Sequence, residues 1–342
     1  MKLESLSPFI SSHAYSVLDK ADKRCQGLLK VSAEFLSDYL KKASINFQDV
    51  CFAVTGSVGR YEALEASDFD LTPIACSASV QEDLLKDNES LRSGLAAALT
   101  VDVSRGRDLT KTVTLSELSD TQKIGGEYDG RTSLTQRILV LTESAQAGGG
   151  LSLDTVRKKI LDAYASERTA GRHPLAFCND LARYYRTVCI DYKARVDTTA
   201  KDWCTRNVKL RHSRKFWYFA TLLGVASIVK TIRPDAPQFV EELLKILSLP
   251  PYQRLFRSLG TEAQAAAGRL LDQYAWYLDF MADPERRGIL SQVTHERRYE
   301  VGGSNPYPTL QWNSKVMHSA MVAVLERVGP EVHERVLDWF LL

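Results

Sequence analysis

The sequence predicts an α+β protein, with a small mixed sheet in its first part and an all-helical second part. Two short apolar runs, Val50–Val54 and Phe69–Ala75, are typical of buried strands. After the glycine triplet at 148–150, strand signals nearly vanish and apolar residues recur at helical spacing. A chain of 342 residues is long enough for two domains, and we place them at residues 1–148 and 149–342.

Helices are expected around these strands. Apolar residues recur every three or four positions over 10–43 and 133–147, and residues 79–98 are rich in Leu, Ala, Glu and Lys. Residues 98–104 alternate apolar and polar side chains, which indicates a third, half-buried strand. In the second domain we expect a polar loop over 283–308 and helices over 152–166, 175–195, 203–230, 237–246, 261–282, 314–327 and 331–341.

Composition indicates the cellular compartment but says little about binding partners. The chain has 44 Lys and Arg against 42 Asp and Glu, so any nucleic-acid contact must come from a local patch. Six scattered cysteines without a C-x-x-C pair indicate thiols in a reducing compartment and argue against zinc. No signal peptide and no apolar stretch of membrane-spanning length is recognisable, so we expect a cytoplasmic protein without membrane contact.

The most informative stretch joins the first two strands. The turn Gly56-Ser57 follows the first strand, and Asp68 and Asp70 stand at the head of the second. Residues i and i+2 of a strand point to the same face, so the two aspartates can hold the same divalent cations. Mg²⁺ prefers carboxylate and phosphate oxygens. Because Gly56 allows a close backbone approach and the Ser57 hydroxyl can donate, we predict a phosphate-gripping turn beside a magnesium site.

A third carboxylate would complete such a site, and Asp102 is our candidate. It lies between Val101 and Val103 on the expected third strand, so its side chain points away from that apolar pair. A strand-end aspartate that is merely exposed to water is the alternative interpretation. The substitutes for this role are Asp108, Glu117 and Glu127.

The pattern G-S-x-G-R-x-E over residues 56–62, followed by D-x-D at Asp68 and Asp70, resembles the nucleotidyltransferase superfamily of the polymerase-β type. It is most similar to nucleotidyltransferases of the DUF294 group and to the uridylyltransferase domain that acts on PII signalling proteins. The minimal nucleotidyltransferases of toxin–antitoxin systems share the spacing. Many minimal members have glycine where this chain has Tyr61, and a bulky side chain there would narrow the entrance or stack on a base.

The resemblance implies an enzyme that moves a nucleoside monophosphate from an NTP to an acceptor hydroxyl. Two Mg²⁺ ions, for which Mn²⁺ can substitute, would be held by Asp68, Asp70 and Asp102, and Asp102 would also activate the nucleophile. Gly56 and Ser57 would bind the nucleotide. Arg60 would either contact a phosphate or pair with a nearby glutamate, Glu62 or Glu65. The helical domain would close the nucleotide cleft.

A basic stretch in the second domain is the other candidate for anion binding. Residues 206–215 hold five bases and no acid, namely Arg206, Lys209, Arg211, Arg214 and Lys215. On a helix, Arg211 and Arg214 share a face with Asn207 and Tyr218. Lys209, Arg214 and Lys215 would neutralise the leaving pyrophosphate, unless the stretch is a solvated face that pairs with acids elsewhere. Residues 180–215 also resemble the helical segment that follows DUF294-like catalytic domains.

The acceptor stays open at this point. Resemblance to the PII-modifying and DUF294 proteins favours a protein hydroxyl, that is, AMPylation or UMPylation. Resemblance to the toxin-type enzymes makes an RNA 3′ end, such as that of tRNA, the alternative, with residues 206–215 as its docking surface. A nucleotide-sensing protein without catalysis is a third interpretation, and the late helices could form a homodimer.

Overall fold

The computed structural model describes residues 3–106, 108–126, 129–166, 173–198, 203–229, 232–233, 238–300 and 305–340. The protein is α+β, and its chain forms two compact units. The sheet unit comprises Ala21–Asp180 and Ile232–Pro250, and the helical unit comprises Met1–Lys20, Leu181–Thr231 and Pro251–Leu342. Residue 148 therefore lies inside the sheet unit, and this division differs from the boundary that we predicted there.

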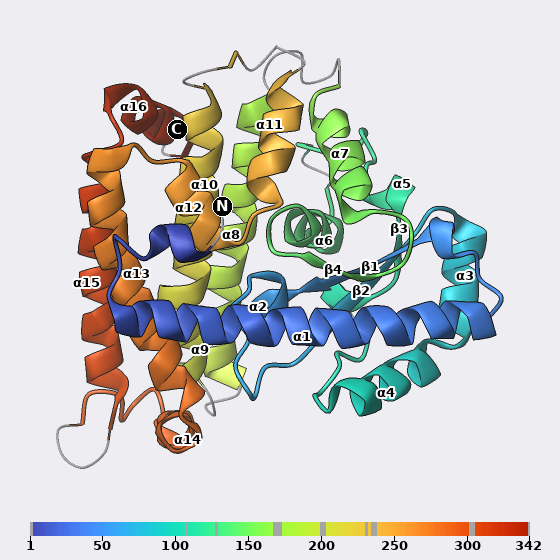
Figure 1. Cartoon of the computed structure of the whole chain (residues 1–342), viewed down its shortest axis with the longest axis horizontal. Helices are drawn as coiled ribbons and strands as arrows, with labels where there is room; N and C mark the ends of the chain where they lie inside the picture. The colour runs from blue at the N-terminus through green and yellow to red at the C-terminus, as the bar shows by residue number, and fades with distance from the viewer. Residues whose placement is uncertain are drawn as a thin grey trace. The chain divides into compact units, whose positions relative to one another are not determined.

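The sheet has four strands in the order β3-β2-β1-β4 (Figure 1). Their bounds are β1 Val50–Thr55, β2 Asp70–Ala75, β3 Val113–Thr114 and β4 Ala145–Gly148. Strand β1 is antiparallel to both β2 and β4, whereas β2 and β3 are parallel. Every residue of β1 is buried, which explains why this strand is an unbroken apolar run rather than an alternating one.

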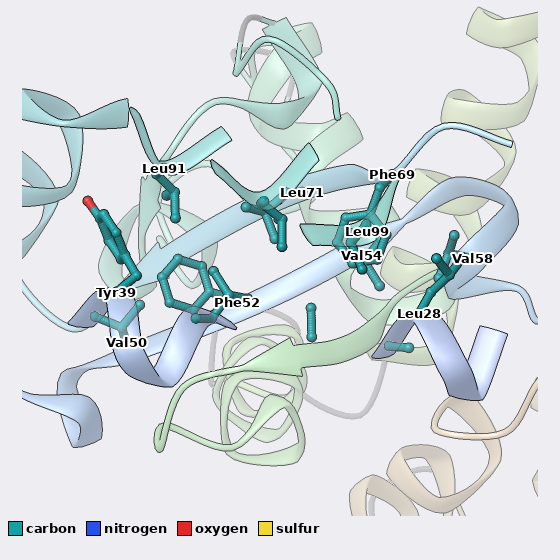
Figure 2. Packing of buried hydrophobic residues seen from close by; sticks show 14 of the residues in the cluster. Leu28, Tyr39, Val50, Phe52, Val54, Val58, Phe69, Leu71, Leu91 and Leu99 are labelled. Carbon is teal, nitrogen blue, oxygen red and sulfur yellow. The ribbon is translucent and has the colours of Figure 1, made fainter. Parts of the chain in front are cut away.

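One face of the sheet is covered by α1 (Ser12–Lys42) and α4 (Asn88–Leu99). Alternate residues of β1 point to this face, and Phe52 and Val54 meet apolar side chains of both helices there (Figure 2). Leu91 and Leu99 anchor α4, while Leu28 anchors α1. Burial of these side chains is the main driving force for packing the helices on the sheet.

The other elements of the sheet unit complete its shell. They are η2 Phe47–Asp49, α2 Gly56–Gly59, α3 Ala78–Lys86, η3 Asp108–Thr110, α5 Leu115–Leu118, α6 Arg131–Thr142, α7 Leu153–Tyr164 and α11 Gln238–Leu247. The short helix η1 Leu3–Leu6 belongs to the helical unit. Helix α7 is tied to the end of α6 by Arg157, whose Nε donates to the Val140 carbonyl at 3.2 Å. Its guanidinium also donates to the Ser144 carbonyl at 2.5 Å.

The helical unit is built from the later helices. After α8 (His173–Thr198), which begins in the sheet unit, come α9 Trp203–Lys209, the π-helical turn η4 Leu210–Arg214, α10 Lys215–Val229, α12 Pro251–Arg257, α13 Thr261–Ala282, α14 Pro284–Gln292, α15 Tyr307–Leu325 and α16 Pro330–Phe340. His212 is buried in η4, stacked on Tyr277 and hydrogen-bonded to Asn313 at 3.0 Å. Within the described ranges, none of the helices has the length and apolar character needed to cross a membrane.

Most predicted elements are confirmed. The strands at 50–54 and 69–75, the helix over 10–43 and most of the later helices are present, and no strand occurs after Gly148 in the described part of the chain. Two helices are more broken than expected, because residues 79–98 divide at Asp87 and residues 203–230 contain the π turn η4. Helices α12 and α14 were not predicted, and α14 lies in the expected loop.

Two predictions about strands are wrong. Residues 98–104 form no strand, since α4 continues to Leu99, Thr100 takes a left-handed φ of 54°, and Val103 then makes only one bridge to Phe69. The predicted helix over 133–147 ends at Thr142, and its last residues belong to β4. Pairing with β1 therefore overrides the weak local preference of this Ala- and Gly-containing segment.

Candidate functional site

The Gly-Ser turn leaves β1 in a backbone conformation that suits glycine. Gly56 has a φ of +72°, in the left-handed region, and begins α2. A Cβ atom on Gly56 would lie 2.7 Å from Oδ2 of Asp70, closer than van der Waals contact allows. Asp70 is also paired with Thr55 across the antiparallel ladder. The missing side chain at Gly56 thus makes room for the Asp70 carboxylate beside the turn.

Ser57 presents a half-buried side chain at this turn. Its carbonyl accepts a hydrogen bond from the Glu62 amide at 2.9 Å, which closes the turn. Its hydroxyl makes no hydrogen bond within the part of the chain that the structure describes. The hydroxyl predicted to grip a phosphate is therefore available to a ligand.

Arg60 is held in the interior by two carboxylates and does not face solvent. It is buried, and its guanidinium forms ion pairs with Glu62 and with Glu143, which are both buried as well. Gly59 permits this arrangement, because a Cβ there would lie 2.0 Å from the Glu143 carbonyl oxygen. Of the two interpretations offered for Arg60, the structure shows the pairing with Glu62, in the interior of the sheet unit.

The backbone of Asp102 is hydrogen-bonded to the D-x-D segment. Its carbonyl accepts a hydrogen bond from the Phe69 amide at 2.8 Å, and the Ser104 amide donates to the Phe69 carbonyl at 3.1 Å. These bonds form the parallel bridge between Phe69 and Val103, whose side chains pack in the core. Although no regular strand is present, the predicted neighbourhood of Asp102 and the D-x-D pair is found.

Asp68 and Asp102 line one pocket of about 490 Å³, together with Glu65 and the C-terminal end of α4. We call these three residues the acidic rim. All three are exposed, and their carboxylates make no ion pair or hydrogen bond in the ranges that the structure describes. Three like charges at one opening repel one another, which favours binding of a cation there.

Asp70 is separate from this pocket. The Leu71 amide donates to the Phe69 carbonyl at 3.0 Å, so a γ-turn centres on Asp70 and disturbs the strand alternation from which we predicted a shared face. The carboxylates thus fall into two places, with Asp68 and Asp102 in the pocket and Asp70 over Gly56. Among the described residues, no three His, Cys, Asp or Glu side chains converge in a way that could hold a metal ion. The donor set suits Mg²⁺ by its chemistry, but the three aspartates do not meet at one point.

The substitutes for Asp102 are weaker candidates. Glu117 completes a capping box at the start of α5, where its carboxylate accepts from the Thr114 amide at 2.7 Å. Glu127 and the side chain of Asp108 lie outside the described residues. Tyr61, the departure from the minimal enzymes, takes a φ of 60° and packs against the hydrophobic core.

The basic stretch belongs to the helical unit, not to the unit that holds the turn and the acidic rim. Within the helical unit, Arg211 donates to Asn207 at 2.7 Å, Arg214 to the Tyr184 hydroxyl at 3.5 Å, and Lys215 to Nδ1 of His318 at 3.0 Å. Burial, with a further contribution from Arg211, lowers the pKa of Lys215. Lys209 is exposed.

Three residues of this region escaped the sequence-based prediction of the site. Glu65 was considered only as a partner for Arg60, although its position three residues before Asp68 was a usable signal. Glu143 and Arg92 carry no motif, and only the fold brings them to the turn and to the D-x-D segment. In comparisons with known proteins, no family model and no curated protein matches this chain.

Proposed function

We propose that this protein is a Mg²⁺-dependent nucleotidyltransferase that moves a nucleoside monophosphate from an NTP to an acceptor hydroxyl. The observation that carries the proposal is the contact between Gly56 and the Asp70 carboxylate. A phosphate held by the amides and hydroxyl of this turn would lie beside a negative carboxylate, and the two would repel unless a cation lay between them. A turn of this kind beside carboxylates therefore suits a nucleotide that binds with its metal ion.

Each residue has a role in this proposal. The Ser57 hydroxyl and the neighbouring amides would hold the β- and γ-phosphates, and Gly56 would allow their close approach. Asp68 and Asp102 in the pocket, and Asp70 beside Gly56, would hold the ions. Bound Mg²⁺ would supply the positive charge that offsets the triphosphate. Glu62, Glu143 and Arg60 would keep the turn in place without contacting the substrate.

The transfer is a single displacement at the α-phosphorus. The acceptor oxygen forms a bond to that phosphorus while the bond to the bridging oxygen of pyrophosphate breaks, so pyrophosphate leaves with the electron pair. Asp102, an exposed carboxylate without an ion pair or hydrogen bond among the described residues, accepts the proton of the acceptor hydroxyl. The products are the nucleotidylated acceptor and pyrophosphate.

The acceptor that we propose is a hydroxyl of a protein, on the resemblance of residues 56–70 to PII-modifying and DUF294 nucleotidyltransferases. The test is to incubate the protein with Mg²⁺ and each α-labelled NTP in a cell lysate and to follow the label. We expect label on a protein band with one NTP, and none with Asp68→Asn or Asp70→Asn. Asp162→Asn is the matched control, since Asp162 is a half-exposed aspartate that pairs with Lys158 on α7.

The outcomes separate the interpretations. Full transfer by Asp68→Asn or Asp70→Asn would contradict the mechanism, and loss of transfer in Asp162→Asn would show a nonspecific effect of removing charge. Nucleotide binding by the wild-type protein without any transfer would favour the sensing protein instead. Label that enters RNA would favour the second candidate function.

That second candidate is transfer to an RNA 3′ end, and the basic stretch favours it. Arg206, Lys209, Arg211 and Lys215 form no ion pair in the portion of the chain that is described, so their charge is not offset locally. An RNA bound through such residues should dissociate steeply as salt rises, because binding releases condensed counterions. Transfer to RNA that is insensitive to Lys209→Ala and to salt would contradict the role of the basic stretch as the docking surface.

A further inference from the structure

A buried arginine donates hydrogen bonds both to β2, just after the D-x-D pair, and to the segment that follows Asp102. Arg92, on α4, is 6% exposed. Its apolar neighbours on the helix, Leu91 and Leu99, lie in the core against the sheet (Figure 2). Because burying a guanidinium is costly unless its donors are satisfied, the contacts of Arg92 indicate what it holds together.

The outer edge of β2 has a gap that Arg92 fills. Phe69 is bridged to Val103, and Ile74 and Ala75 pair with β3, but the segment between Val103 and β3 leaves this edge as far as the structure describes it. Within the gap, Nη1 of Arg92 donates to the Leu71 carbonyl at 3.1 Å. The guanidinium thus takes the place of a missing strand partner.

The same guanidinium reaches the other side of the gap. Its Nη1 donates to the Ser104 carbonyl at 2.7 Å, and its Nη2 donates to the Thr110 carbonyl at 2.8 Å. Its Nε donates to Asn88 at 2.8 Å, one turn earlier on α4, which fixes the orientation of the planar group. Three carbonyls from separate segments are therefore held by one rigid fork of donors.

Gly106 confirms how closely the chain wraps this group. A Cβ on Gly106 would lie 2.6 Å from Nε of Arg92, and the residue has a φ of +71°. Burial lowers the pKa of Arg92 to about 10, and the nearby Asp70 opposes this shift. Arg92 is thus charged at neutral pH and close enough to Asp70 to interact with it.

We propose that Arg92 is a positioning residue that fixes the Asp102 segment against β2, and thereby sets the cation affinity of the acidic rim. This inference rests on the proposed function for its metal. Leu71 lies three residues after Asp68 and Ser104 lies two residues after Asp102, so each of these aspartates of the acidic rim shortly precedes a carbonyl that Arg92 holds. Residues that orient metal ligands in this way typically change metal affinity about 10- to 100-fold when removed.

The experiment compares Arg92→Met and Arg92→Lys with the wild-type protein. Lysine keeps the charge beside Asp70, but its three donors radiate from one nitrogen and cannot span the three carbonyls. Arg157→Met is the matched control, because Arg157 is 4% exposed and also donates to backbone carbonyls, those of Val140 and Ser144. Cooperative unfolding and far-UV circular dichroism show which variants fold.

Two readouts are needed, namely Mn²⁺ binding by electron paramagnetic resonance and hydrogen exchange over the peptide that holds Asp102 and Ser104. We expect Arg92→Met to weaken Mn²⁺ binding about tenfold or more and to speed exchange in that peptide, with Arg92→Lys between it and the wild type. Arg157→Met should leave Mn²⁺ affinity unchanged, because Arg157 donates to the Val140 and Ser144 carbonyls and not to the segments that hold Asp68 and Asp102.

Two results would overturn the role of Arg92. One is unchanged exchange over Asp102 and Ser104 in a folded Arg92→Met protein, whether or not Mn²⁺ binds. The other is an equal loss of Mn²⁺ affinity in Arg157→Met, which would mean that any buried arginine matters alike. Absence of Mn²⁺ binding by the wild-type protein would contradict the proposed function itself. Hydrogen exchange over Asp102 and Ser104 would still test the positioning role of Arg92, because it needs no bound metal ion.

Discussion

Two sets of acidic side chains in the sheet unit differ in burial and in ion pairing. Glu62 and Glu143 are buried and share the guanidinium of Arg60. Asp68 and Asp102 are exposed, and the described part of the chain offers their carboxylates no ion pair or hydrogen bond. The first set has its charge compensated inside the protein, so its role is structural. The second set keeps its charge for something outside the chain.

This difference in compensation explains the difference in burial. A carboxylate can leave water only if a partner charge and hydrogen bonds replace its hydration, and Arg60 provides both for the buried pair. The acidic rim has no such partner in the part of the chain that the structure describes, and its members stay in contact with solvent, where repulsion between them is weakened. Removing a buried member should therefore lower the free energy of unfolding, whereas removing a member of the acidic rim should leave it nearly unchanged and weaken cation binding.

The largest expected effect is on stability, from Glu143→Ala. The change would leave the buried guanidinium of Arg60 with one carboxylate instead of two, and breaking a buried ion pair typically costs about 3–5 kcal/mol. Urea unfolding measures the loss. Glu65→Ala is the control at the acidic rim, and a surface change of this kind should stay within about 0.5 kcal/mol. Equal losses in the two variants would mean that burial and pairing do not distinguish the two sets.

His212 extends the comparison to a buried group whose charge can change. Burial lowers its pKa to about 4, against an ordinary value of 6.5. Because the folded-state pKa is the lower one, the unfolded chain binds the proton first, and stability is lost as pH falls from 6.5 to 4. The loss through this group is on the order of 3 kcal/mol.

The check on His212 is urea unfolding at pH 7 and pH 4 for the wild-type protein and His212→Asn. The variant should be less stable at pH 7, because it loses the bonds to Val208 and Asn313, but its stability should fall less on acidification. The surrounding groups, Arg211, Lys215 and Tyr277, are unchanged in both proteins. An identical fall in both proteins would show that His212 is not the group that titrates.

Gly56→Ala tests the contact between the turn and the D-x-D pair. A left-handed φ costs a residue with a Cβ about 1–2 kcal/mol, and the new methyl group would displace the Asp70 carboxylate. We expect moderate destabilisation, seen in thermal unfolding, and a loss of nucleotidyl transfer that is greater than the destabilisation explains. Gly130→Ala is the matched control, since its φ is −63° and a Cβ there meets nothing within 4 Å. Full transfer by a folded Gly56→Ala protein would remove this turn from the site.

The smallest expected effect on stability is that of Asp102→Asn. Removing one of the uncompensated charges of the acidic rim should change the free energy of unfolding by less than about 0.5 kcal/mol, or raise it slightly. Urea unfolding at low ionic strength is the sensitive measurement. A loss of several kcal/mol would place Asp102 with the structural carboxylates.

The local part of this fold was open to prediction from the sequence, and the non-local part was not. The strand that ends at Thr55, the turn after it and the strand that starts at Asp70 each carry their own pattern of residues, so they were found. Strand β4 exists because it pairs with β1, and its own sequence gives little sign of it. Helix α14 did leave a signal, since Asp283 caps it and Pro284 is its first residue.

The candidate site divides in the same way. Spacing and the family resemblance made Asp68, Asp70 and Asp102 candidates, and the bridge between Phe69 and Val103 shows why the Asp102 segment lies beside the D-x-D segment. A strand pattern could not indicate that the Leu71 amide donates to the Phe69 carbonyl around Asp70, nor that Asp70 lies apart from the pocket. Arg92 and Glu143 act through contacts that join distant parts of the sequence.

The most direct test of the central claim is a titration of Mn²⁺ in the presence of NTP, followed by electron paramagnetic resonance. It compares the wild-type protein with the double variant Asp68→Asn, Asp102→Asn and with the control Asp162→Asn. If the uncompensated carboxylates are a cation site, the wild-type protein and the control bind Mn²⁺ alike and the double variant binds it at least about tenfold more weakly. Equal Mn²⁺ binding by all three proteins would contradict the account.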